Sequence, residues 1–429
     1  MSRDLMSQSP DELENMADEL RSQYELVGAN QMSLDLSRGK PAPDQLSLSE
    51  GMEDAIAGNY RSADGTDVRN YGGIRGLLEA RELGAELLDV SPDEVLAVGN
   101  SSLQLMHLVV ATALTKGLFG ADSAWQNQSP KILAPVPGYD RHFTLTEHLG
   151  IDMLNIPMTA EGPSIDAALA AAENDPSIKG IWCVPKYSNP TGVTCSDANV
   201  DAIAELPKRA AADNFVVLWD NAYAVHDLEA TTVELAPIAE AAKRHGTQDH
   251  IVQFASTSKV TFAGAGVGFI AASPAVLNVL ENELQFQTIG PDKVNQLRHA
   301  RFLKNNLHAH MQAHAALLQP KFAIVLDVLN RDLGGMNIAT WTEPKGGYFV
   351  SLDLLPGLAS KVVAMAKAVG LSLTPAGAPF PYGIDPEDKN VRIAPTFASL
   401  EDLTAAMEVL TLCVKLASVE QKLNNAENS

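Results

Sequence analysis

Five short apolar runs, separated by stretches suited to helices, constrain the fold more than any other feature of this sequence. They are Lys131–Val136, Ile178–Val184, Phe215–Asp220, Ile251–Ala255 and Gly266–Ala272. Several of them are continuously apolar and rich in strand-forming residues, rather than alternating between apolar and polar positions. Strands covered by helices on both faces have this pattern. The sequence therefore predicts an α/β fold with a mostly parallel sheet between helices.

Further elements are expected on either side of this sheet. A helix is predicted over Pro10–Val27, because its Ser-Pro-Asp-Glu start is typical of a capped N-terminus. A long helical tract from about Asn295 to Leu333 should lead to a smaller α/β domain, where Gly346–Leu354 and Asn390–Pro395 are predicted strands. We expect residues 1–50 to pack with this small domain, residues 51–310 to form the large domain, and residues 311–429 to form the small one.

Charge and cysteine content exclude several classes of function. The net charge of −22 would repel nucleic acid and anionic membrane surfaces, so neither is an expected partner. The three cysteines are scattered and odd in number, which favours a reducing compartment. The N-terminus lacks the apolar segment of a secretory signal, so we expect a cytoplasmic protein. Val260–Leu280 contains no charged residue, but its glycines and Pro274 favour a buried strand and turn over a membrane span.

A lysine follows the fourth apolar run in the sequence Ser-Thr-Ser-Lys, which ends at Lys259 and precedes a glycine-rich turn. A lone lysine is most often a solvated surface charge. In a partly desolvated, electropositive pocket, however, the pKa of a lysine amine falls and the amine becomes a nucleophile and a proton carrier. The hydroxyls of Ser256 and Ser258 would be donors for a phosphate group beside it.

Other polar motifs also follow apolar runs, where an open α/β sheet binds its ligands. Asp220 ends the third run and either caps a helix or faces a ligand. Asn189 opens an Asn-Pro-Thr-Gly segment that by itself indicates only a turn. Ser101 and Ser102 open a predicted helix, whose first amides and hydroxyls either form a simple cap or bind an anion. Arg392 in the small domain is suited to a planar, bidentate grip on a carboxylate.

Taken together and in this order, these motifs resemble those of the class I, fold type I aminotransferases that depend on pyridoxal 5′-phosphate (PLP). The resemblance covers the chain from about Ser37 to Cys413 and looks closest to a divergent subgroup of aspartate aminotransferases. It implies the fold type I architecture, with a large PLP-binding domain and a smaller α/β domain. It also implies a homodimer with shared active sites.

The resemblance assigns a role to each matching residue. Lys259 would hold the cofactor as a Schiff base and move the proton, and Asp220 would pair with the pyridine nitrogen. Tyr223 and Asn189 would donate to the phenolic oxygen, and Tyr139 in the Pro-Gly-Tyr-Asp segment would stack on the ring. The remaining implied contacts are Arg392 with the substrate α-carboxylate, and Ser101, Ser102, Ser256, Ser258 and the partner subunit's Tyr71 with the phosphate.

Two features depart from the family pattern. Where the family has Gly-x-Arg-x-Gly after the lysine, this chain has Gly266 in place of the phosphate-binding arginine. The loop that touches the substrate reads Ser-Arg-Gly-Lys-Pro, with Arg38 and Lys40 on either side of Gly39. An acidic substrate needs a second cation for its distal carboxylate. The candidates, in order, are Arg141, Lys40, Arg38 and Arg75, although a lone basic residue is more often a surface charge.

The expected reaction is ping-pong transamination from an acidic amino acid, most simply aspartate, to a 2-oxo acid. A β-lyase or a decarboxylase on the same scaffold is the alternative. A regulator with an aminotransferase-like effector domain would need an N-terminal winged helix, and only one predicted acidic helix precedes Ser37. His310 and His314 have the spacing of a zinc helix, but the motif's glutamate and a third ligand are missing, so we expect a solvated helix face and no metal.

Overall fold

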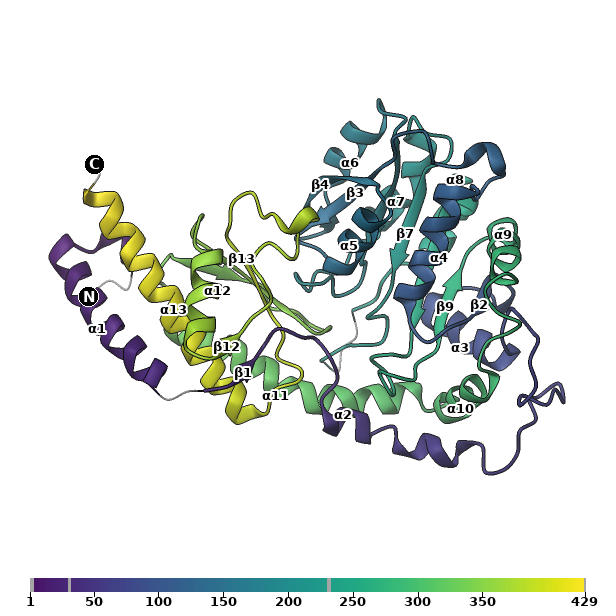
Figure 1. Cartoon of the computed structure of the whole chain (residues 1–429), viewed down its shortest axis with the longest axis horizontal. Coiled ribbons are helices and arrows are strands. Elements are labelled where there is room, and N and C mark those ends of the chain that lie inside the picture. Colours follow the sequence, from purple (N-terminus) through teal and green to yellow (C-terminus); the bar gives the residue numbers. More distant parts are fainter. Residues whose placement is uncertain (1–3, 30–31, 230–232, 428–429) are drawn as a thin grey trace.

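The larger part of the chain is built on an eight-stranded sheet (Figure 1). The computed structural model describes residues 4–29, 32–229 and 233–427. The strand order is β2-β9-β8-β7-β6-β3-β4-β5, and the five central strands from β8 to β4 are parallel. Their bounds are β2 Val95–Ala97, β3 Lys131–Val136, β4 Asp152–Thr159, β5 Gly162–Pro163, β6 Ile178–Cys183, β7 Val216–Asp220, β8 Ile251–Ser256 and β9 Gly268–Ala271.

The predicted α/β fold is confirmed, because helices bury both faces of this sheet. In β7, Val216 and Leu218 pack toward α4 and α9, whereas Val217 and Trp219 pack toward α6, α7 and α8. The helix bounds are α3 Leu78–Leu88, α4 Ser102–Thr115, α5 Asp140–His148, α6 Ile165–Ala172, α7 Asp197–Arg209, α8 Ile238–His245 and α9 Pro274–Leu284. All five predicted runs contain strands, but β9 is antiparallel to β8.

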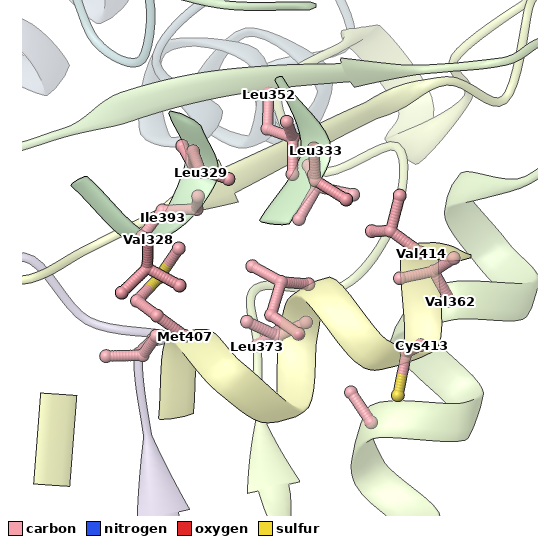
Figure 2. Close-up of a cluster of buried hydrophobic side chains, with 14 of the residues drawn as sticks. Val328, Leu329, Leu333, Leu352, Val362, Leu373, Ile393, Met407, Cys413 and Val414 are labelled. Carbon is pink, nitrogen blue, oxygen red and sulfur yellow. The ribbon is translucent and has the colours of Figure 1, made fainter. Parts of the chain in front are cut away.

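The smaller part combines a three-stranded antiparallel sheet with long helices. Its sheet has the order β10-β11-β13, and a separate pair joins β1 to β12. The element bounds are α1 Pro10–Ala29, β1 Leu34–Asp35, α2 Pro43–Ser47, β10 Ala339–Trp341, β11 Val350–Leu354, α12 Ala359–Ala368, β12 Leu371–Ser372, β13 Asn390–Ile393 and α13 Leu400–Glu427. One apolar core holds these elements together, and Figure 2 shows α11, β11, β13 and α13 contributing to it. Leu13, Ala17 and Leu20 of α1 belong to the same core.

The helical tract predicted from about Asn295 is two helices rather than one. The first is α10 (Lys293–Leu303) and the second is α11 (Leu307–Leu333). Asn305 between them has a φ of 60°, a left-handed conformation that a continuous helix does not allow. α11 runs from beneath the large sheet to the core of the smaller part (Figure 1). The domain boundaries at residues 50 and 310 remain a prediction.

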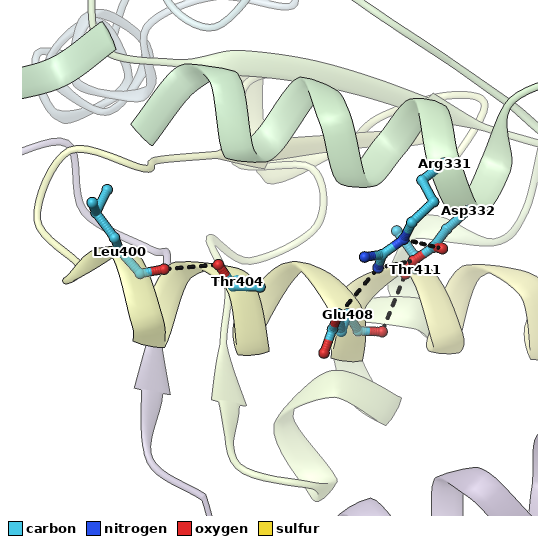
Figure 3. A network of polar contacts seen from close by, with 6 residues as sticks. All are labelled: Arg331, Asp332, Leu400, Thr404, Glu408 and Thr411. Carbon is cyan, nitrogen blue, oxygen red and sulfur yellow. Dashed lines mark hydrogen bonds and ion pairs between the residues drawn. The ribbon is translucent and has the colours of Figure 1, made fainter. Parts of the chain in front are cut away.

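Polar contacts fix the far end of α11 against α13 (Figure 3). Arg331 donates to Glu408 at 3.3 Å, and the Thr411 hydroxyl donates to Asp332 at 2.8 Å. Arg331 is about half exposed, so we expect its ion pairs to orient the helices more than to stabilise them. Among the residues the structure describes, no helix is both long enough and apolar enough to cross a membrane.

Candidate functional site

The carboxyl ends of the parallel strands bring the main candidate residues together. Asp220 is the last residue of β7, and Ser256 is the last residue of the neighbouring β8, three positions before Lys259. Tyr139 follows β3 and is the N-cap of α5. Asn189 lies in the loop after β6. Because these strands are parallel and adjacent, their following residues meet at one edge of the sheet.

Asp220 is a buried carboxylate with two different surroundings. Its Oδ2 lies 2.9 Å from His142 Nε2, so this hydrogen bond requires the proton on Nε2. The His142 ring in turn stacks on Trp182, with the ring centres 4.1 Å apart. The other oxygen, Oδ1, is shielded from solvent and has no hydrogen-bond partner among the described residues. A buried acceptor without a donor is costly, so Oδ1 is suited to a cationic or N–H group of a ligand.

The Lys259 amine lies near Asp220 and over an aromatic ring. Its Nζ is 5.1 Å from the centre of the Tyr223 ring. Desolvation lowers the pKa of Lys259 below its usual value, while the Asp220 charge acts in the opposite direction. A lowered pKa increases the fraction of neutral amine, which is the nucleophilic form. The backbone carbonyl of Lys259 is fixed by His226 Nε2 at 3.2 Å and by the Tyr348 hydroxyl at 3.4 Å.

Arg392 is almost completely buried, with 7% of its side chain exposed, and its guanidinium is held on several sides. Its Nη1 donates to Asp140 at 2.8 Å and to Asn189 Oδ1 at 3.3 Å, and its Nε donates to Thr374 at 3.3 Å. The group also lies over the ring of Phe349, 5.0 Å from the ring centre. These contacts fix the orientation of a planar cation that can bind a carboxylate in a bidentate manner.

The ring of Phe349 also explains a glycine in the predicted substrate loop. A Cβ atom at Gly39 would collide with that ring, so only glycine allows the loop to approach this closely. Gly39 therefore lies next to Phe349, the residue whose ring the Arg392 guanidinium covers.

Serine hydroxyls and helix amides meet near the start of α4. The side chain of Ser101 is at the N-cap but makes no capping hydrogen bond, and Ser102 begins the helix. The Ser258 hydroxyl donates to the carbonyl of Asn100 at 3.2 Å, which joins the Lys259 loop to the α4 loop. Ser256 Oγ accepts from the Ser258 amide at 3.4 Å. A helix N-terminus with nearby hydroxyls is an anion-binding arrangement.

The four candidate cations for a distal carboxylate are placed differently. Arg38, Lys40 and Arg141 are exposed, and Lys40 Nζ lies 3.9 Å from the centre of the Phe397 ring. Arg141 is close enough to Tyr139 to oppose the rise in its pKa that burial causes. Arg75 instead donates to the backbone carbonyl of Asp93, just before β2. Its Nε also lies 3.9 Å from a carboxylate oxygen of Glu281 in α9.

Tyr71 belongs to the candidate set but contacts little of this chain. Its side chain is 78% exposed. Only contact with a second subunit would cover this side chain.

The expectation of a solvated face for His310 and His314 is wrong. Both histidines are buried, with 5% and 1% of their surface exposed. His310 Nε2 lies 2.7 Å from the Val260 carbonyl, next to Lys259, and His314 bonds to His310 and to Gln45. The spacing of His310 and His314 correctly predicted that they share one face of the helix. That face, however, packs against the loop that contains Lys259. Within the described ranges, no group of three or more metal-binding side chains is present.

The sequence reasoning gave no role to the residues that orient the main groups. His142 supports Asp220, and His226 and Tyr348 support Lys259. A sequence signal existed for the two histidines, because each lies within three residues of a candidate, three after Tyr139 and three after Tyr223 respectively. Tyr348 and Phe349 come from a distant segment and carried no such signal.

Comparisons with known proteins agree over nearly the whole chain. The family model described as Aspartate amino-transferase matches residues 8–426. A protein of Mycolicibacterium smegmatis, provisionally named as an aminotransferase, is 46% identical over 422 residues, which cover 95% of this chain and 98% of that relative. An aspartate aminotransferase of Corynebacterium glutamicum is 40% identical over 411 residues, covering 95% of this chain and 94% of the relative. The crystal structure of an aspartate transaminase from Corynebacterium glutamicum has a TM-score of 0.93 at 39% identity, covering 98% of this chain and 99% of that chain.

Proposed function

Because this chain belongs to the aspartate aminotransferase family, whose members are PLP-dependent, we propose that it transfers the amino group of an acidic amino acid to a 2-oxo acid. Aspartate is the proposed donor, and 2-oxoglutarate or oxaloacetate is the proposed acceptor. One observation carries the proposal. The Lys259 amine lies near the Asp220 carboxylate, and the same chain also contains the buried guanidinium of Arg392.

The residues at the sheet edge fit PLP. Asp220 Oδ1 is a buried acceptor without a donor, which suits the protonated pyridine nitrogen. The unengaged Ser101 side chain and the first amides of α4 suit the phosphate. When bound, PLP supplies an electron sink for the substrate's Cα–H bond.

Each residue then has a defined task. Lys259 would hold the cofactor through its amine and would accept the proton from the substrate's Cα. Asp220 would keep the pyridine nitrogen protonated, and His142 holds Asp220 in place through its hydrogen bond to Oδ2. Arg392 binds the α-carboxylate, for which its contact with Asp140 must loosen. Asn189 and Tyr223 are assigned to the phenolic oxygen, where donors stabilise negative charge.

Two observations support an acidic substrate. The relative from Corynebacterium glutamicum is named an aspartate aminotransferase. Arg141 also lies beside Tyr139, and the loop containing Gly39 carries two further exposed cations. We assign the distal carboxylate to Arg141 first, then to Lys40 and Arg38. The same proposal includes a cytoplasmic homodimer in which Tyr71 reaches the partner's phosphate site.

The test is a half-reaction with aspartate and no 2-oxo acid. One equivalent of oxaloacetate per site should be released, and the visible band of the cofactor should be lost as the cofactor takes up the amino group. Adding 2-oxoglutarate should then restore the band and yield glutamate. Lys259→Ala is the control; it should lack the absorbance band of the Schiff base between lysine and PLP, and it should release no oxaloacetate. Release of alanine with carbon dioxide, or of ammonia, in place of oxaloacetate would favour a decarboxylase or a lyase.

A further inference from the structure

Gly266 lies at a close contact between two loops, where a side chain would require its neighbours to shift. A Cβ atom there would lie 2.9 Å from the Ser258 hydroxyl, 3.0 Å from the Asn100 carbonyl and 3.1 Å from the Ser258 amide. The segment after Lys259 is therefore pressed against the loop that precedes α4. A side chain at position 266 would require these two loops to shift, and Gly266 itself supplies no cation, so a cation for the phosphate would come from another element.

One arginine lies in the hollow beside these loops. The hollow has a volume of about 480 Å³ and is lined by both loops and by the first turns of α10, including Asn295 and Arg298. Asn295 and Arg298 are three residues apart, so they share one face of the helix. The Asn295 side chain donates to the carbonyls of Ala265 and Gly266, each at 3.0 Å. Asn295 thus anchors α10 to the segment that contains Gly266.

Arg298 is oriented but not neutralised. Its Nη2 donates to Asn295 Oδ1 at 2.6 Å, which directs the guanidinium toward the same segment. Its Nε is shielded from solvent and has no hydrogen-bond partner, and no carboxylate of the described residues forms an ion pair with it. The one acid lining the hollow, Asp292, uses its carboxylate to cap α10 at Asn295 N. A shielded guanidinium N–H without an acceptor fits an anion that the protein itself does not supply.

We propose that Arg298 supplies the cation for the PLP phosphate, in place of the arginine that is missing at Gly266. The α4 amides and the serine hydroxyls bind the phosphate from one side, and Arg298 neutralises it from α10. Asn295 is a positioning residue that holds the arginine on the Gly266 segment. The inference rests on the proposed function only in requiring that the chain binds PLP.

Binding of PLP and of pyridoxal to the apoprotein tests this assignment without measuring turnover. Pyridoxal has the same ring and aldehyde but no phosphate. Arg298→Ala should weaken PLP binding by about 10- to 100-fold, the effect of one charge-assisted hydrogen-bonding group, and leave pyridoxal binding unchanged. Arg298→Lys should recover part of the loss, because the charge remains but the fork geometry does not. Inorganic phosphate should raise the melting temperature of the wild-type apoprotein and fail to do so for Arg298→Ala.

Lys304→Ala is the matched control, because it removes one exposed positive charge from the C-terminal end of the same helix. It should bind PLP as the wild type does. Wild-type affinity in Arg298→Ala, or an equal loss of PLP and pyridoxal binding, would overturn the assignment. If Arg298→Ala does not fold, Arg298→Gln, which is shorter but keeps a polar side chain with an N–H donor and no charge, replaces it, and the same comparison decides. Turnover of aspartate is not part of this test, so a wild-type protein that binds PLP but does not transaminate would contradict the proposed function alone.

Discussion

Asp220 shows at the scale of one residue how the chain prepares a site for a ligand. Its two oxygens differ, since one is bonded to His142 and the other is buried without a donor. A polypeptide does not gain stability by burying an unsatisfied carboxylate oxygen. The arrangement is understandable if a bound group completes it, so the stability of this site should depend on the cofactor.

His142→Phe tests this dependence. Phenylalanine retains the stacking on Trp182 but removes the donor to Asp220, which leaves both carboxylate oxygens unsatisfied. We expect the free energy of unfolding of the apoprotein to fall by about 1–3 kcal/mol. The loss should be smaller in the holoprotein, where the cofactor nitrogen faces Asp220. Urea unfolding of both forms measures it. His142→Asn, which keeps a donor, should recover part of the loss, and equal losses in both forms would contradict the expectation.

Asp140 competes for the guanidinium that is assigned to the substrate. Arg392 Nη1 donates to Asp140 at 2.8 Å, so a substrate carboxylate has to replace or share this partner. Asp140→Asn removes the competing charge and should lower KM for aspartate by about 3- to 10-fold, with kcat changing less. Steady-state kinetics with varied aspartate measure this effect. Asp140→Glu is the control and should retain the competition. A rise in KM would mean that Asp140 instead holds Arg392 in its binding orientation.

At the scale of one element, α11 connects the smaller part of the molecule to the lysine loop. The N-terminal half of this helix carries His310 and His314 beneath Lys259, and its C-terminal half contributes Val328, Leu329 and Leu333 to the other core (Figure 2). Burial lowers the pKa of His314 to about 4 and lowers that of His310 as well. Both histidines are therefore neutral in the folded protein at neutral pH.

A pH dependence follows from these lowered pKa values. Between the ordinary histidine pKa of 6.5 and the folded value of about 4, the unfolded chain binds a proton that folded His314 does not. The stabilisation is complete above pH 6.5 and is lost as pH falls through this window. His314→Gln should therefore show a shallower loss of unfolding free energy between pH 6.5 and pH 4, by on the order of 2 kcal/mol. Urea titrations at several pH values give the two slopes. His308→Gln, an exposed change on the same helix, should keep the wild-type slope, and parallel curves for His314→Gln would contradict the expectation.

The elements that local patterns determine were predictable, and those that distant contacts determine were not. β3, β6, β7 and β8 lie in predominantly apolar runs, and their parallel order placed Asp220 beside the Lys259 loop. β4 was missed because most of its residues are exposed, and Asp152, Asn155 and Thr159 interrupt its apolar residues. The burial of His314 was missed because helical spacing shows which residues share a face but not what covers that face. Gln45, which covers it, is far away in the sequence.

At the scale of the whole molecule, α1 from the start of the described chain packs against α13 from its end, within the smaller part (Figure 1). The larger part carries a cluster of exposed apolar side chains near Tyr71. Phe286 is 88% exposed and Ile289 is 67% exposed, and Gly290, which follows them, packs against Gly72 beside Tyr71. Lys293 also donates to the Gly72 carbonyl at 2.6 Å. This surface is the expected contact for a second subunit, because aromatic and aliphatic groups are enriched at interface cores.

Subunit mixing tests whether Tyr71 completes the partner's site. Lys259→Ala and Tyr71→Ala should each have little activity alone, because the first lacks the amine and the second lacks the phosphate contact. In a dimer of one variant with the other, one site would combine the intact Lys259 of one chain with the intact Tyr71 of its partner. Statistical mixing makes half of the dimers mixed, and half of their sites intact, so activity should return to about one quarter of the wild-type value. Denaturing, mixing in equal amounts and refolding with PLP measures this recovery. Refolding each variant alone is the control, and no recovery in a preparation shown to contain mixed dimers would place Tyr71 outside the shared site.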